Sequence, residues 1–279
     1  MTDRFSLAGH DVHRVGYGTM QLPGPGVFGP PGDHDGAIAV LRRARELGVD
    51  HFDTSAYYGP WVSNDLLREA LYPYEDMTIV SKVGGRRGPD KGWIEASSPA
   101  ELEWGIDENL IGLGVERVDV MNLRLMEIGD PAFDEKLGTM VDAVNAGKIG
   151  AIGLSNVRVA ELDRAGDLGV DVACVQNRYA LTFREDEAML QTCAERGIAY
   201  TPFFPLDFGN VTGNAVVRSI ASRLGATPAQ IGLAWLLAHA PNLLVIAGTS
   251  SLAHLEENVA VGDIELSVED VAALDAVAA

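Results

Sequence analysis

The sequence predicts a (β/α)8 barrel, because short apolar runs alternate with helix-period segments along the whole chain. The 279 residues are a typical length for one such barrel, and no proline-rich or serine-rich linker divides them. We therefore expect a single domain over residues 1–279. The alternative is an open, doubly wound sheet. That fold ordinarily binds a dinucleotide through a G-x-G-x-x-G motif directly after a strand, and no such motif follows a predicted strand here.

The predicted strands are short, and several are rich in Val and Ile, as is typical of strands buried on both faces of a parallel sheet. The segment 5–13 precedes the first of them, and we expect it to form a β-hairpin that closes the bottom of the barrel. The apolar runs cover residues 14–18, 51–53, 78–82, 118–123, 151–154, 172–176, 198–204 and 243–247.

Helices are predicted between these runs, where apolar residues recur at helical spacing. Two of the helices have clear start signals. Ser98 and Thr227 each stand directly before a proline, and each is followed three residues later by Glu101 or Gln230. A capping hydroxyl, a proline at the first helical position and a Glu or Gln three residues on together indicate a helix N-terminus.

The net charge of −19, from 40 acidic and 21 basic side chains, argues against nucleic acid or an anionic membrane as a partner. No apolar run approaches the roughly 20 residues of a membrane-spanning helix, and the N-terminus lacks the features of a signal peptide. We therefore expect a cytoplasmic protein, monomeric or weakly homo-oligomeric, that acts on a small molecule. Cys174 and Cys193 are expected to be buried free thiols, and no cluster of side chains predicts a metal.

Polar side chains end most of the predicted strands, and in a barrel these ends converge on one mouth. Asp53 ends the second run and leads to Tyr58, and Lys82 ends the third. An ammonium group near a phenol favours the phenolate, and a carboxylate behind the lysine holds it charged and oriented. Tyr58 could then donate a proton to a carbonyl oxygen while a cofactor supplies hydride to the carbon. Asp53, Tyr58 and Lys82 could each have a purely structural role, but it is less plausible that all three do.

Several motifs resemble those of the aldo-keto reductase family. Residues 48–59, which include Asp53 and Tyr58, resemble one family signature, and Lys82 stands at the position of the family's lysine. Residues 147–156 resemble a second signature and residues 248–258 the final motif. The resemblance covers nearly the whole chain. It implies a (β/α)8-barrel oxidoreductase that reduces an aldehyde or ketone with a nicotinamide cofactor.

The same resemblance implies a cofactor site at the barrel mouth. Ser155, Asn156 and Gln176 match residues that hold the nicotinamide amide, and Phe203 matches the aromatic residue that stacks on its ring. The resemblance implies NADP(H), because the family favours it, and NAD(H) is the alternative. Gly248 and His254 stand where NADP-preferring members often carry lysine and arginine, and Ser250 and Ser251, near a helix N-terminus at about residue 252, are candidate phosphate donors. The expected cofactor-binding residues are Gly18, Thr19, Met20, Asp53, Ser155, Asn156, Gln176, Phe203, Phe204, Leu206, Gly248, Thr249, Ser250, Ser251, His254, Glu257 and Asn258.

One catalytic position departs from the family pattern, because Arg124 stands where members usually carry a histidine. Arginine stays protonated and cannot shuttle a proton, but it can polarise a carbonyl oxygen, depress the pKa of Tyr58 or hold an anionic substituent. An ion pair with a carboxylate at the mouth is the structural alternative. The pattern around Arg124 is similar to a bacterial branch that includes pyridoxal reductases, which makes a pyridoxal-like aldehyde a candidate substrate.

Other readings stay open at this point. The missing histidine also fits a cofactor-binding sensor or regulatory subunit with little turnover, and Lys82 could act as the nucleophile of a Schiff-base lyase. Ser155 and Asn156 could simply cap the next helix, and Phe203 and Phe204 could be ordinary packing. Aromatic residues in predicted loops above the mouth are candidates for the substrate pocket, with ordinary loop packing as the alternative: Phe28, Trp61 and Trp93.

Overall fold

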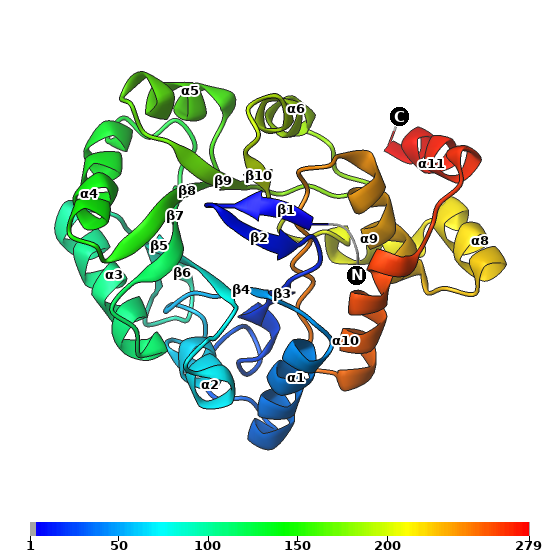
Figure 1. Cartoon of the computed structure of the whole chain (residues 1–279), viewed down its shortest axis with the longest axis horizontal. Helices are drawn as coiled ribbons and strands as arrows, with labels where there is room; N and C mark the ends of the chain where they lie inside the picture. Colours follow the sequence, from blue (N-terminus) through cyan, green and yellow to red (C-terminus); the bar gives the residue numbers. More distant parts are fainter. Residues whose placement is uncertain (1–3, 279) are drawn as a thin grey trace.

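The barrel wall is a curled sheet of parallel strands, seen end-on in Figure 1. The computed structural model describes residues 4–278. The strands of the wall are β3 (Tyr17–Gly18), β4 (His51–Asp53), β5 (Thr78–Arg87), β7 (Val118–Arg124), β8 (Ile149–Ser155), β9 (Val172–Gln176) and β10 (Ala199–Tyr200). Their order in the sheet is β10-β9-β8-β7-β5-β4-β3, and β6 (Trp93–Ala96) pairs with β5 outside this path.

The eighth place in the wall is filled by the segment 243–247, which forms isolated parallel bridges rather than a regular strand. Leu243 pairs with Tyr200 on one side, and Val245 pairs with Val15 on the other. The Gly16 N–H donates to the Val245 carbonyl oxygen at 2.8 Å. These bridges close the sheet between β10 and β3, which confirms the predicted (β/α)8 barrel.

Helices surround the wall and cover its outer face (Figure 1). Both predicted N-termini are confirmed, since Ser98 with Glu101 and Thr227 with Gln230 form capping boxes. The helices are α1 (His34–Glu46), α2 (Val62–Leu71), α3 (Pro99–Leu113), α4 (Phe133–Asn145), α5 (Val159–Asp167), α6 (Glu187–Glu195), α7 (Asn210–Gly213), α8 (Ala215–Leu224), α9 (Pro228–His239), α10 (Leu252–Val259) and α11 (Val268–Asp275).

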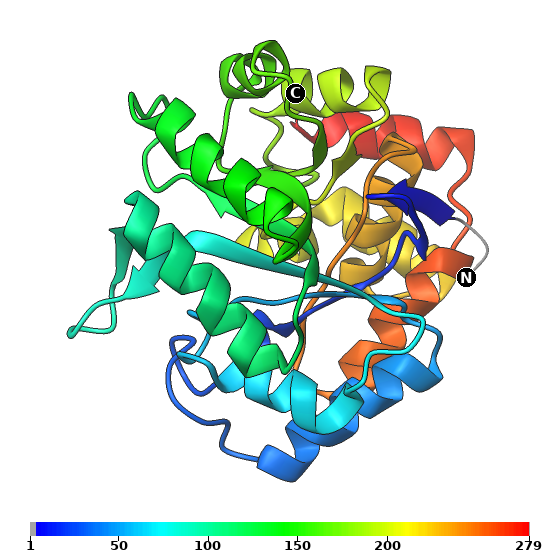
Figure 2. The same cartoon turned by 60° about the vertical axis from the view of Figure 1, so that its left-hand side comes forward.

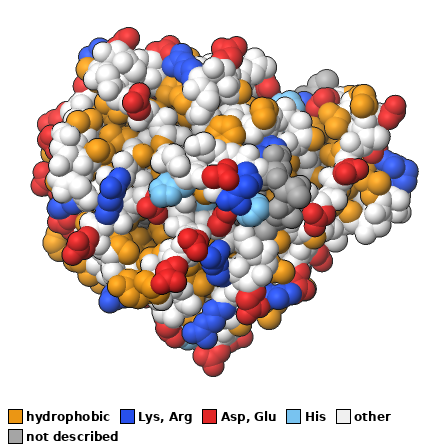
Figure 3. Space-filling model, viewed as in Figure 1, with side chains coloured by type: hydrophobic (Ala, Val, Ile, Leu, Met, Phe, Trp, Pro, Cys, Tyr) orange, Lys and Arg blue, Asp and Glu red, His pale blue; other side chains and the backbone are white. Residues whose placement is uncertain are grey.

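The predicted N-terminal hairpin is confirmed as β1 (Arg4–Leu7) and β2 (His10–His13), and it lies over the centre of the ring in Figure 1. Leu7 and Val12 pack against inward-facing residues of the wall, among them Val80 and Val120. The hairpin therefore closes the bottom of the barrel with apolar side chains. Figure 3 shows this face, where basic and acidic side chains lie together; Arg4 forms ion pairs there with Asp11 and Asp50.

One strand is longer than predicted. β5 does not end at Lys82 but continues to Arg87 and pairs antiparallel with β6, with Arg87 opposite Trp93. The expectation that Trp93 lies in a loop is therefore wrong. The extension forms an arm that projects beyond the barrel wall (Figure 2). Its residues Gly84-Gly85-Arg86-Arg87 lack the apolar pattern by which the rest of β5 was recognised.

The two cysteines are buried free thiols in β9 and α6, as predicted. In residues 4–278 no group of His, Cys, Asp and Glu is arranged to hold a metal ion. None of the helices in this range is long and apolar enough to cross a membrane.

The barrel interior depends on a glycine in β8. Gly153 pairs in register with Asn122 of β7 and Cys174 of β9. A Cβ atom at Gly153 would lie 1.9 Å from the Asn122 Oδ1 atom and 2.7 Å from the Cys174 Sγ atom. The Cys174 thiol donates to that same Oδ1 at 3.2 Å, so the missing side chain makes room for a polar contact inside the wall.

We predict that Gly153→Ala lowers the free energy of unfolding by about 1–3 kcal/mol, because the new methyl group overpacks the interior. The matched control is Gly138→Ala on α4, where an added Cβ meets no atom within 4 Å. That change should be neutral or stabilising by up to about 1 kcal/mol, because alanine is the better helix former. Urea denaturation measures both, and equal stability of the two variants would contradict the prediction.

Candidate active site

A buried ion pair lies at the mouth of the barrel. The Lys82 Nζ atom is 2.5 Å from the Asp53 Oδ1 atom and also donates to the Thr54 carbonyl oxygen at 3.0 Å. The second oxygen of Asp53 accepts from the Gln176 Nε2 atom at 2.9 Å. All three side chains are buried, with 2–3% of their surface exposed. The carboxylate is thus held by a cation on one oxygen and by an amide on the other.

The alternation of side chains along each strand brings these residues together. In β4, Phe52 belongs to the apolar core and the next residue, Asp53, faces the barrel interior. In β5, Val83 faces the same core and Lys82 points inward. Because β4 and β5 are neighbours and parallel, their C-terminal ends place the two charges side by side.

Tyr58 follows β4 in a tight turn, where its N–H donates to the Ser55 carbonyl oxygen at 3.1 Å. Its ring is buried, and the Lys82 Nζ atom lies 4.9 Å from the ring centroid. Burial, and then the Asp53 carboxylate, raise the pKa of Tyr58 above its usual value, while the Arg124 guanidinium opposes this shift. The free protein therefore keeps Tyr58 as a protonated phenol at neutral pH.

A polar network behind this site fixes the turn that carries Tyr58. Asn109 of α3 accepts at Oδ1 from the Ala56 N–H at 3.0 Å and from the Asn64 Nδ2 atom at 3.0 Å. Asn64 in turn accepts from the Thr54 hydroxyl at 2.7 Å, and Thr54 accepts from the Thr19 hydroxyl at 2.9 Å. Asn109 was not among the site residues expected from the sequence. The available signal was a polar residue on the otherwise apolar, buried face of a predicted helix.

Arg124 is the last residue of β7 and pairs in register with Ser155 of β8. Its Nη1 atom donates to the Ser155 Oγ atom at 3.1 Å, and its Cζ atom lies 5.0 Å from the centroid of the Phe203 ring. Within residues 4–278 its guanidinium forms no ion pair, so the structural alternative of a mouth carboxylate is not realised. Arg124 therefore presents a half-buried positive charge to the mouth.

Ser155 and Asn156 do not cap the following helix, because α5 begins at Val159 with Arg158 as its N-cap. Asn156 has a left-handed backbone with φ of 59°, and its Nδ2 atom donates to the Leu125 carbonyl oxygen at 2.8 Å. Ser155 and Asn156 thus lie at the end of β8, beside Gln176 at the end of β9.

The expected phosphate region lies where the barrel closes. Gly18 and Gly248 meet backbone to backbone, since a Cβ atom at Gly248 would lie 2.2 Å from the Gly18 carbonyl oxygen. α10 begins at Leu252, as expected, and Ser251 is its N-cap. Ser250, which precedes Ser251, is exposed. The remaining residues expected around this region are Thr19 and Met20 in a short 3-10 helix, Thr249 before α10, and His254, Glu257 and Asn258 within α10.

An aromatic loop follows β10. The Phe203 and Phe204 rings are perpendicular, with their centroids 5.3 Å apart, and the centroids of the Phe204 and Phe208 rings are 4.4 Å apart. Phe204, Asp207 and Phe208 all have positive φ. Asp207, which follows Leu206, stabilises this strained segment by accepting from Arg178 at 2.6 Å, as well as from a threonine and an asparagine. Phe203 and Phe204 thus belong to a constrained loop at the mouth.

The three aromatic residues expected in the substrate pocket have different surroundings. The Trp93 and Tyr58 rings are nearly perpendicular, with their centroids 6.3 Å apart. The Arg87 Cζ atom lies over the Trp93 ring, 4.0 Å from its centroid. The same Cζ atom lies 5.4 Å from the centroid of the Phe28 ring. The Trp61 indole N–H donates to Glu108 on α3 at 3.2 Å. Of the three, Trp93 therefore has a ring contact with Tyr58.

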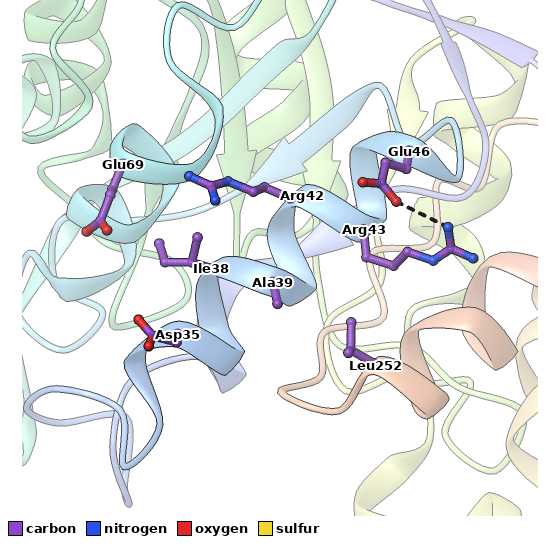
Figure 4. Close-up of a pocket in the computed structure, with 8 residues that line it drawn as sticks. All are labelled: Asp35, Ile38, Ala39, Arg42, Arg43, Glu46, Glu69 and Leu252. Carbon is purple, nitrogen blue, oxygen red and sulfur yellow. Dashed lines mark hydrogen bonds and ion pairs between the residues drawn. The ribbon is translucent and has the colours of Figure 1, made fainter.

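A separate groove lies on the outside of the barrel, between α1, α2 and the start of α10 (Figure 4). Charged side chains of α1 line it, and Arg43 forms an ion pair there with Glu46 at 3.2 Å. The groove contains none of the residues that end the barrel strands. The candidate active site is therefore the mouth and not this groove.

The sequence profile of the Aldo/keto reductase family matches residues 14–279. The chain belongs to this family. It is 47% identical to pyridoxine 4-dehydrogenase of Escherichia coli K12, over 99% of this chain and 98% of that protein. The resemblance to the aldo-keto reductases is thus confirmed, and the protein is an oxidoreductase.

Solved structures of the family have the same fold. A thermostable aldo-keto reductase bound to the inhibitor epalrestat is 28% identical, with a TM-score of 0.85 over 98% of this chain and 99% of that one. An aldo-keto reductase of Klebsiella pneumoniae in complex with NADPH is 24% identical, with a TM-score of 0.84 over 99% of this chain and 95% of that one.

The buried ion pair predicts strong coupling between Asp53 and Lys82. Lys82→Met leaves a buried carboxylate without its cation, and we expect a loss of about 3–5 kcal/mol in the free energy of unfolding. The double variant Asp53→Asn/Lys82→Met should recover much of that loss, because no unpaired charge remains. A double-mutant cycle by urea denaturation measures the coupling, and losses that simply add would contradict a direct interaction.

Proposed function

We propose that the protein reduces an aldehyde or ketone to an alcohol with NADPH, and that Tyr58 donates the proton. One observation carries this proposal: a protonated, buried Tyr58 lies against the Lys82–Asp53 pair at the mouth. A phenol in that position can give its proton to a carbonyl oxygen, and the neighbouring ammonium stabilises the phenolate that results.

The residues at the mouth fit a nicotinamide cofactor. Gln176 uses its Nε2 atom on Asp53, and its carbonyl oxygen, which forms no hydrogen bond within residues 4–278, can accept from an amide N–H. Ser155 and Asn156 end the adjacent strand with further polar groups, and Phe203 offers an aromatic face. When bound, the reduced cofactor supplies the hydride that no side chain can provide.

Each residue of the pair has a distinct task in this scheme. Asp53 keeps Lys82 charged and fixes its position through a 2.5 Å contact. Lys82 stabilises negative charge on the Tyr58 oxygen after the proton has left. Arg124 adds a second cation, which favours the phenolate of Tyr58 and can polarise the carbonyl oxygen of the substrate.

NADPH is preferred over NADH in this proposal because of the start of α10. Its first N–H groups carry a partial positive charge and are accompanied by the hydroxyls of Ser250 and Ser251. This combination suits the additional phosphate that distinguishes NADPH. The Klebsiella relative, which was solved with NADPH, supports the same choice.

A pyridoxal-like aldehyde is the substrate we favour. The support is the name of the E. coli relative, pyridoxine 4-dehydrogenase, whose sequence matches this chain over nearly its full length. Reduction of such an aldehyde needs a proton donor and a hydride donor at the same carbonyl group. The mouth can bring together Tyr58 as the proton donor and the reduced cofactor as the hydride donor.

We predict that Tyr58→Phe lowers kcat/KM for aldehyde reduction by about 10²–10⁴-fold, the usual contribution of a general acid. NADPH affinity, measured by fluorescence titration, should stay within about twofold, because the phenol hydroxyl is not needed to hold the cofactor. Tyr72→Phe, at an exposed tyrosine, is the control and should keep full activity. Near-normal turnover of Tyr58→Phe would show that the proton comes from elsewhere.

We also predict that Ser250→Glu weakens NADPH binding by about fivefold, since like charges about 4 Å apart in water cost about 1 kcal/mol. NADH lacks the extra phosphate, so its affinity should change less. Ser222→Glu, at an exposed serine of α8, controls for the change in net charge. If Ser250→Glu affects both cofactors equally, the phosphate lies elsewhere.

A further inference from the structure

The arm formed by β5 and β6 (Figure 2) carries Arg87, whose guanidinium holds two loops together through their backbone. Its Nη1 atom donates to the Val27 carbonyl oxygen at 2.7 Å, and its Nη2 atom donates to the Gly26 carbonyl oxygen at 2.9 Å. Its Nε atom donates to the carbonyl oxygen of Lys91, in the turn between β5 and β6, at 3.0 Å. All three guanidinium nitrogens thus bind backbone, which requires the planar fork of donors that arginine has and lysine lacks.

Two of these carbonyl groups belong to residues with strained backbone. Val27 has a φ of 57° and Lys91 a φ of 65°, both in the left-handed region. This conformation is rare for a β-branched residue such as valine, and it persists only where the surrounding structure imposes it. Arg87 helps to impose it, because it binds the carbonyl oxygen of both residues. Strain of this kind is concentrated at functional sites, which indicates that the shape of the two loops serves the mouth.

The loop that contains Val27 is also attached to the turn that carries Tyr58. Phe28 forms a parallel bridge with Gly59, the residue directly after Tyr58. The Gly29 N–H donates to the Gly59 carbonyl oxygen at 2.8 Å. This loop is therefore bound to Arg87 at one point and to the Tyr58 turn at the next.

Arg87 is connected to Tyr58 by a second route, through Trp93. The Arg87 Cζ atom lies 4.0 Å from the centroid of the Trp93 ring and 5.4 Å from that of the Phe28 ring, so the cation packs on both aromatic groups. The Trp93 ring is nearly perpendicular to the rings of Tyr57 and Tyr58, with centroids 5.7 Å and 6.3 Å away. Trp93 is still 45% exposed, so part of its ring is available to a ligand beside Tyr58.

We propose that Arg87 is a positioning residue for the substrate, because it holds Trp93 beside Tyr58 as one wall of the substrate site. Trp93 contacts the part of the aldehyde away from the carbonyl group that Tyr58 protonates. Arg87 acts through Trp93 and through the loop of Val27, and not on the reacting atoms. This inference rests on the proposed function, and it identifies the contacts that set the affinity for the aldehyde.

Such a wall predicts an effect on KM rather than on kcat. A contact away from the reacting atoms is equally strong in the bound substrate and in the transition state, so its loss weakens binding and leaves the chemical step nearly unchanged. A lysine at position 87 keeps the positive charge but cannot donate to three carbonyl groups or stack as a plane. Arg87→Lys should therefore resemble Arg87→Gln and not the wild type.

The test uses 4-nitrobenzaldehyde and NADPH as the probe substrates. Arg87→Gln should raise KM for the aldehyde about tenfold, the usual size of one aromatic contact, and Trp93→Ala should do the same. kcat should stay within about threefold in both variants. Added to Trp93→Ala, Arg87→Gln should change KM less than about twofold, because the wall it positions is already gone. Arg86→Gln, at the neighbouring exposed arginine of the arm, is the control and should leave KM unchanged.

A second readout needs no turnover. Quenching of tryptophan fluorescence by acrylamide measures how accessible each indole is. The contribution of Trp93 is the difference between each form of the protein and the same form carrying Trp93→Phe. This contribution should be quenched more strongly in Arg87→Gln and Arg87→Lys than in the wild type, whereas Arg86→Gln should leave it unchanged. Arg87→Lys is the milder change and serves if Arg87→Gln does not fold.

Unchanged quenching of Trp93 in the Arg87 variants would overturn the inference. So would KM effects of Arg87→Gln and Trp93→Ala that multiply in the double variant, or a fall in kcat with KM unchanged. Failure of every form, including the wild type, to oxidise NADPH with any aldehyde would instead reject the proposed function, while the quenching still decides whether Arg87 holds Trp93 in place.

Discussion

The site depends on one constraint: two opposite charges are buried at the mouth of the barrel, and neither is tolerable without the other. The Lys82–Asp53 pair is almost fully shielded from water, so each charge must be compensated within the protein. Parallel neighbouring strands satisfy this requirement, because their C-terminal ends hold the two residues at a fixed separation. The turn after β4 then presents Tyr58 to the ammonium group.

The two ends of the barrel have different roles: the bottom is packed with apolar side chains, and the mouth carries the polar side chains of the candidate active site. At the bottom, the β1–β2 hairpin seals the interior with Leu7 and Val12 against apolar wall residues. At the top, the strands end in polar side chains that face the mouth. Gly153 lies between these levels and leaves room for Asn122 and Cys174. An apolar lower interior and a polar mouth allow the upper residues to be arranged for binding a ligand.

Local patterns predicted much of this arrangement, and long-range contacts account for what was missed. The bounds of β4 and β9 agree with the sequence prediction, because each is an apolar run that ends at a polar site residue. The arm of β5 beyond Lys82 was missed, since its glycines and arginines carry no strand pattern and it is stabilised by pairing with β6. Asn109 was also missed, because its importance depends on neighbours that only the folded chain brings close.

A crystal structure of the protein with NADPH bound, in which the distances from the Lys82 Nζ atom are measured, tests most directly whether Lys82 serves Tyr58. In that complex we expect Nζ to contact both the Asp53 carboxylate and the Tyr58 hydroxyl within hydrogen-bonding reach, about 3 Å. A Lys82 that turns away from Tyr58, with the hydroxyl bonded elsewhere and remote from the nicotinamide, would contradict it.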